Sequence, residues 1–202
     1  MHVYPVIVLL VVVAGATVMF VWNVRRSTRQ RVELELRRWA RDHQFAVGFP
    51  VPEAAGGVLA TCAIDQSIGN AACVFVRGRR GKGQSCRILI VRTDMDWPGS
   101  ALRSVRAGDS IMDDLREFRA YPALPGGERF VTLGTTIRAG KILANSSLRT
   151  LLPPDLSVLL QGPWLLLDFS SRPFDTLEFS RLLPLANQLV GHLPAYSAAA
   201  VK

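Results

Sequence analysis

The chain has 202 residues and a formal net charge of +8, with 24 Lys and Arg against 16 Asp and Glu. Its three cysteines, Cys62, Cys73 and Cys86, form no C-x-x-C or Cys/His spacing, which excludes the common zinc and thioredoxin-type motifs and predicts buried, reduced thiols. Half of the excess charge lies in residues 25–43 and the rest is spread thinly, so we expect no nucleic-acid partner.

Residues 3–22 form an apolar run without a charged side chain. A run of this length is about 30 Å long as a helix, which predicts one transmembrane helix over residues 3–24. A cleaved signal peptide is the rival interpretation, because Ala14-Gly15-Ala16 imitates a cleavage site. Residues 1–4 lack the basic charge of a signal peptide and the apolar run continues to Trp22, so we predict a retained signal-anchor.

Four arginines follow this run directly, at Arg25, Arg26, Arg29 and Arg31. Basic residues collect on the cytoplasmic flank of a spanning helix. The sequence therefore predicts a single-pass protein of the cell membrane, with its N-terminus outside and its C-terminal domain cytoplasmic. We expect the four arginines to contact anionic lipid headgroups at the membrane surface.

Residues 25–44 predict a basic juxtamembrane helix. Val32, Leu36, Trp39, Ala40 and His43 recur at helical spacing and form one apolar stripe. The stripe either packs on the following domain or lies on the bilayer surface; the bulky Trp39 favours packing on the domain.

Residues 45–194 predict one α+β domain with an antiparallel sheet and helices packed on one face, followed by a flexible tail over 195–202. Short apolar runs bounded by turn residues predict strands over 58–64, 72–77, 86–92 and 129–133, and a hairpin joining 158–160 to 164–169. Ser110 and Asp113 resemble a capping box at the start of a helix over 109–119. Asp175 predicts the start of the last helix, with Glu178 at the reciprocal capping position.

The loop 77–83 reads Arg-Gly-Arg-Arg-Gly-Lys-Gly and lies between two predicted strands. A phosphate-binding P-loop needs Ser or Thr after the lysine and a helix after the loop, and this loop has neither. A basic hairpin tip is the plain interpretation. Contact with an anionic partner through Arg77, Arg79, Arg80 and Lys82 is the functional alternative.

Asp94 and Asp96 are two carboxylates on alternate residues after a predicted strand. Such a pair could hold a divalent ion or share acid and base roles, but the sequence supplies no further ligands. His2, His43 and His192 form no visible catalytic or metal set. We therefore assign no catalytic, cofactor-binding or metal-binding residue and expect no cofactor.

The order of these features resembles a group of uncharacterised bacterial single-pass membrane proteins, common in high-GC actinobacteria. The likeness rests on Trp39-Ala40-Arg41-Asp42-His43-Gln44-Phe45, which follows a W-A-R-x-x-x-F/W pattern, and on a closing module from Phe130 to Pro194. The loop 77–83 departs from the group. The resemblance implies an architecture and no activity.

Three functions remain open at this level. The first is a membrane-anchored cytoplasmic interaction module without catalysis, which binds the membrane and an unknown protein partner. The second is a membrane-anchored enzyme or small-ligand sensor with a site near Asp94, Asp96 and the loop 77–83. The third is an outward-facing envelope component, against which the odd number of cysteines argues. The sequence does not indicate the oligomeric state.

Overall fold

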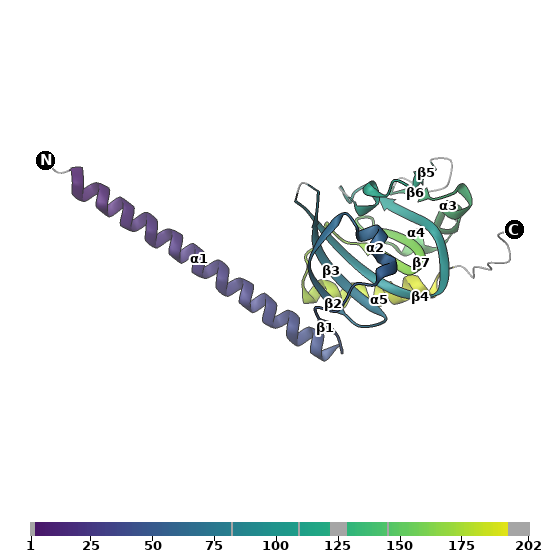
Figure 1. Ribbon diagram of the computed structural model, residues 1–202, viewed down its shortest axis with the longest axis horizontal. Helices are drawn as coiled ribbons and strands as arrows, with labels where there is room; N and C mark the ends of the chain where they lie inside the picture. Colours follow the sequence, from purple (N-terminus) through teal and green to yellow (C-terminus); the bar gives the residue numbers. More distant parts are fainter. Residues whose placement is uncertain (1–2, 82, 109, 122–128, 145, 194–202) are drawn as a thin grey trace.

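The computed structural model describes residues 3–81, 83–108, 110–121, 129–144 and 146–193 (Figure 1). The side chains of residues 3–12, 29, 54 and 56 also lie outside the description. The predicted tail over 195–202 falls outside it as well.

The first element is a helix of 40 residues, α1 (Val3–Asp42), which is about 60 Å long. It projects from a domain built on a seven-stranded sheet (Figure 1). The strands are β1 (Ala46–Val47), β2 (Cys62–Gly69), β3 (Cys73–Arg80), β4 (Gln84–Ser104), β5 (Arg119–Ala120), β6 (Phe130–Gly134) and β7 (Ser157–Asp168). The helices of the domain are α2 (Glu53–Leu59), the 3-10 helix η1 (Ile111–Asp114), α3 (Ile137–Ala144), α4 (Leu148–Leu151) and α5 (Thr176–Gly191).

All the strand pairs are antiparallel, and the 21-residue β4 organises the sheet. β7 pairs with β4 from Ile88 to Leu102. On the other edge of β4, β3 pairs with residues 84–91 and β6 pairs with residues 100–104. The order β1-β2-β3-β4-β6-β5 confirms the predicted antiparallel α+β domain.

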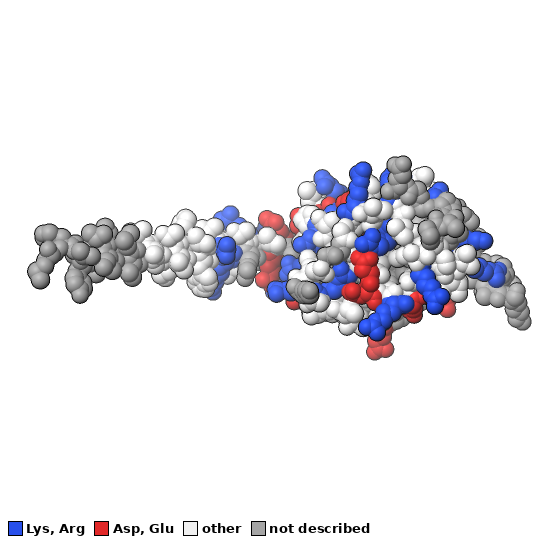
Figure 2. Space-filling view, turned by 90° about the horizontal axis from the view of Figure 1, so that it is seen from above, with Lys and Arg blue, Asp and Glu red and all other residues white. Residues whose placement is uncertain are grey.

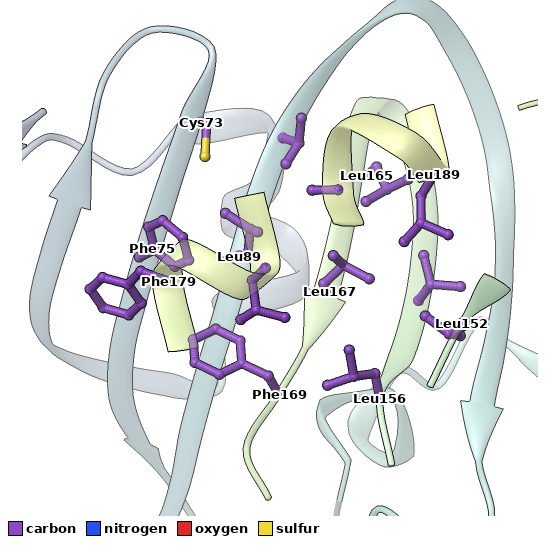
Figure 3. Close-up of a cluster of buried hydrophobic side chains, with 14 of the residues drawn as sticks. Cys73, Phe75, Leu89, Leu152, Leu156, Leu165, Leu167, Phe169, Phe179 and Leu189 are labelled. Carbon is purple, nitrogen blue, oxygen red and sulfur yellow. The ribbon is translucent and has the colours of Figure 1, made fainter. Parts of the chain in front are cut away.

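Both faces of the sheet are covered. On one face, Phe75, Leu89 and Leu167 pack with Phe179 of α5 (Figure 3). Residues at the end of α1 belong to the same cluster. On the other face, Val76 and Ile88 pack against α2 and η1. The prediction that helices pack on only one face of the sheet is therefore wrong. The central strands are apolar at consecutive positions, which is typical of strands buried on both sides.

No helix within the described residues is long and apolar enough to cross a membrane. This finding overturns the predicted transmembrane helix over 3–24. It also contradicts two predictions that depend on that helix. One is the signal-anchor, and the other is the single-pass placement in the cell membrane with the N-terminus outside and the domain in the cytoplasm.

Three local predictions have different outcomes. The capping box at Ser110 is confirmed, although the helix that it begins is only the four-residue η1. The start of α5 is confirmed, since the Asp175 carboxylate accepts a hydrogen bond of 2.9 Å from the Glu178 amide. The predicted hairpin at 161–163 is wrong: β7 is continuous, and Gly162 takes a positive φ of 55° where the register with β4 shifts.

Candidate functional site

The C-terminal end of α1 is fixed to the domain through Trp39. The indole Nε1 donates a hydrogen bond of 3.0 Å to Ser180 Oγ of α5. The ring meets Phe179 and Phe75 edge-on, with centroids 5.1 and 5.9 Å away, and stacks on His43 at 4.3 Å. Leu36 and Ala40 are buried beside it, so these three residues of the predicted stripe pack on the domain. Val32 and His43, the other two, remain exposed.

A groove of about 1130 Å³ separates α1 from the β2–β3 hairpin. On the helix side it is lined by Val24, Arg25, Thr28, Val32, Glu33 and Leu36. On the domain side it is lined by Val47, Asp65, Gln66, Arg77, Gly78, Arg79, Gly83 and Ser85. The groove therefore combines apolar side chains with charges of both signs.

Beyond the groove, the projecting part of α1 exposes large apolar side chains. Phe20 is 70 % exposed, Met19 66 % and Trp22 57 %. Val13, Val18, Val21 and Val24 are exposed as well. Figure 2 shows this part of the helix as a surface without charge, followed toward the domain by basic and then acidic side chains. A helix that is apolar on all sides is normally enclosed by other structure, but no described residue of this chain covers this segment.

The arginines predicted to lie at a membrane surface are spread along the exposed helix. Arg25 lines the groove. The Arg26 guanidinium lies over the Trp22 ring, 5.3 Å from its centroid. Arg31 is exposed, and the side chain of Arg29 lies outside the description. No contact among the described residues tests their predicted binding to lipid headgroups.

The structure separates the four basic residues predicted to meet an anionic partner. Arg77 and Arg79 line the groove, and Arg79 forms an exposed ion pair of 3.4 Å with Asp65. Arg80 lies on the opposite face, is only 6 % exposed, donates to the Ser110 carbonyl oxygen and pairs with Asp114 at 3.3 Å. Lys82 lies outside the described residues. Arg80 is therefore a structural residue that ties β3 to the start of η1.

Arg77 brings positive charge next to a second, partly buried guanidinium. It is the register partner of Arg87 on β4, and its own guanidinium lies 5.3 Å from the centroid of Phe174. The Arg87 side chain donates to the carbonyl oxygens of Ser170 and Arg172. Burial, and then the charge of Arg77, lower the pKa of Arg87 below its ordinary value.

The structure does not bring Asp94 and Asp96 to the loop 77–83. The loop lies at the start of β4, and Asp94 lies ten residues further along that strand, or about 33 Å at about 3.3 Å per residue. Both aspartates are exposed, at the register shift between β4 and β7. In the described part of the chain, no three His, Cys, Asp or Glu side chains gather as a metal site would require.

Sequence reasoning missed two features of this surface. Asp65 and Gln66 line the groove, but nothing in the local pattern of β2 connects them with α1. The contact between Cys62 and Cys86 was also missed, because their spacing of 24 residues matches no motif. Both features depend on which strands become neighbours.

Comparisons with known proteins give a likeness at the level of fold. No protein-family model matches the chain, and no curated protein matches it. The crystal structure of the mycobacterial trehalose monomycolate transport factor A, TtfA, is similar, with a TM-score of 0.51 and 12 % sequence identity. The likeness covers 82 % of this chain and 98 % of that one. The chain therefore has a fold that a mycobacterial protein also has.

Proposed function

We propose that this chain is a non-catalytic interaction module that binds a partner protein along the projecting part of α1 and the adjoining groove. The observation that carries the proposal is the exposed apolar segment from Val18 to Val24. This segment lies outside the domain and takes no part in the buried core of the domain. Burying one Val, Met or Phe side chain contributes about 1.5–3 kcal/mol, so a partner that covers this segment gains substantial affinity.

The chemistry of the surface specifies the partner. Apolar side chains surround the helix axis in this segment, so the partner must offer an apolar concave surface rather than a flat patch. Arg25, Arg26 and Arg31 follow the segment directly, and we expect acidic residues at the matching border of the partner. Trp22 with its stacked Arg26 is the kind of aromatic and arginine pair that anchors interfaces.

The name of the structurally similar mycobacterial protein suggests where to look first. That protein is described as a transport factor. As part of the proposal, we extend a role in transport to this chain, with another protein of a transport assembly as the partner.

A pair of matched variants tests the proposal. Phe20 and Leu177 are both helical and exposed, at 70 % and 62 %, but Leu177 lies on α5, in the domain. We expect Phe20→Glu to lower the amount of co-purified partner at least about tenfold, as the loss of one buried aromatic side chain predicts. Leu177→Glu should retain it. Purification from native cells with quantitative mass spectrometry measures both, and equal recovery with the two variants would contradict the proposal.

A further inference from the structure

Cys62 and Cys86 lie in contact although their strands are not neighbours. Their Sγ atoms are 3.1 Å apart, with β3 running between β2 and β4. Cys86 is buried, whereas Cys62 is half-buried and lies at the first position of β2. Both are free thiols.

Gly78 on the intervening strand explains how the two sulfurs meet. Gly78 pairs with Ile64 of β2 on one side and with Cys86 of β4 on the other. A Cβ at this position would lie 2.5 Å from the carbonyl oxygen of Ala63, so the backbone of β2 passes unusually close over β3. The register of β2 also shifts between Ile64 and Gln66. This bend carries the start of β2 toward β4.

We propose that Cys62 and Cys86 form a reversible intramolecular disulfide when the protein meets hydrogen peroxide. The Cys62 thiol first loses its proton, and the thiolate attacks one peroxide oxygen. The O–O bond breaks, which makes a sulfenic acid at Cys62, and the hydroxide that leaves takes up that proton and becomes water. The Cys86 sulfur then attacks the Cys62 sulfur, and the S–O bond breaks. The hydroxyl group that leaves Cys62 takes the proton of the Cys86 thiol and becomes the second water. Two thiols and one peroxide thus give one disulfide and two waters, and the sulfurs approach by about 1 Å to reach the roughly 2.05 Å of a disulfide.

The surroundings give the two thiols different roles. The hydrogen bond with Cys86 lowers the pKa of the Cys62 thiol, with smaller effects from the Thr61 hydroxyl and the Arg80 guanidinium, while burial and the carboxylate of Asp114 oppose them. The same hydrogen bond and burial raise the pKa of Cys86, and the Asp168 carboxylate adds to this. Cys62 is therefore the attacking thiol and Cys86 the resolving thiol.

Cys73 provides an internal control. It is buried in the core cluster to which α5 contributes, and burial raises its pKa to about 12. At neutral pH it therefore holds almost no thiolate and should remain reduced. The Cys73→Ser variant should form the disulfide as the wild-type chain does.

The test is oxidation of the full chain with hydrogen peroxide, followed by thiol counting under denaturing conditions, intact mass and peptide mapping. We expect loss of two of the three thiols, a loss of two hydrogens in mass, a Cys62–Cys86 cross-linked peptide, and reversal by a dithiol reductant. The rate should rise with pH and level off below the ordinary thiol pKa. Cys62→Ser should slow oxidation of Cys86 at least about tenfold.

Three results would overturn the proposal. The first is a wild-type chain that keeps Cys62 and Cys86 as thiols while a small-molecule thiol in the same tube is oxidised. The second is Cys62 as sulfinic acid beside a free Cys86. The third is a disulfide that involves Cys73 or joins two chains. Because the wild-type readout uses no substitution, it remains decisive even if Cys62→Ser fails to fold.

Discussion

At the scale of single residues, Arg172 links Asp155, which precedes β7, to Glu178 in the first turn of α5. Its Nε and Nη2 donate to the two carboxylate oxygens of Asp155 at 2.6 and 2.7 Å, and its Nη1 donates to Glu178 Oε1 at 2.7 Å. The Glu178 side chain is only 5 % exposed. A carboxylate this buried depends on its partner, because removing one member of a buried pair leaves an uncompensated charge.

Replacing Arg172 with Met should therefore lower the free energy of unfolding by about 3–5 kcal/mol. The matched control is Arg181→Met, because Arg181 also approaches Glu178, at 3.8 Å, but is 65 % exposed. That change should cost less than about 1 kcal/mol. Urea denaturation followed by circular dichroism measures both, and equal costs would show that Arg172 is not the partner that stabilises Glu178.

The same cluster predicts a pH dependence. The hydrogen bonds from Arg172 lower the pKa of Asp155 below its ordinary value. A carboxyl group with a lowered pKa stabilises the fold above its unfolded pKa of about 3.9, and this stabilisation is lost as the pH falls through the lower folded value. The stability difference between the wild type and Asp155→Asn should therefore be full at about pH 6 and shrink below about pH 4. A difference that is constant across this range would contradict the assignment.

At the scale of elements, the docking of α1 rests on Trp39. Trp39→Ala removes the ring contacts with Phe75 and Phe179 and the hydrogen bond to Ser180. We expect it to cost about 3–5 kcal/mol. Trp39→Phe keeps an aromatic ring and loses the hydrogen bond, so it should cost about 0.5–1.5 kcal/mol.

Thermal unfolding and limited proteolysis between α1 and β1 measure this effect. Trp39→Ala should also expose the segment around Gln44 to cleavage, since Phe45 packs on the Trp39 ring at 5.4 Å. Unchanged protection of this segment would mean that Leu36 and Ala40 hold the helix without the indole.

The sequence signals at element boundaries were reliable where one side chain determines the geometry. Asp175 and Ser110 accept hydrogen bonds from the amides that their spacing predicted, and the β3–β4 hairpin turns through Gly81 and Gly83, both with positive φ. The continuous β7 was not predictable, because a Gln-Gly-Pro segment fits either a turn or a bulge and its pairing with β4 decides between them. The helix α2 contains Gly56 and Gly57, which have low helical propensity, and packing against the sheet overrides it.

At the scale of the whole molecule, a closed two-faced domain carries a helix about 60 Å long that it covers only near one end (Figure 1). The apolar character of the outer segment was evident in the sequence, but its environment was not. The groove beside it could not be predicted, because Arg25, Asp65 and Arg77 line one groove only once the fold places α1 beside β2 and β3. In the proposed function, the domain holds one end of α1 in place, and the exposed apolar segment is the surface that a partner protein would cover.

The most direct test of this account is cross-linking from one position on that segment in native cells. A photoreactive phenylalanine analogue at position 20 should cross-link to one protein other than this chain, whereas the same analogue at position 177 should not. The cross-link should disappear when Trp22→Glu is added. Equal cross-linking from both positions, or a cross-link at position 20 only to a second copy of this chain, would contradict the proposed partner-binding role.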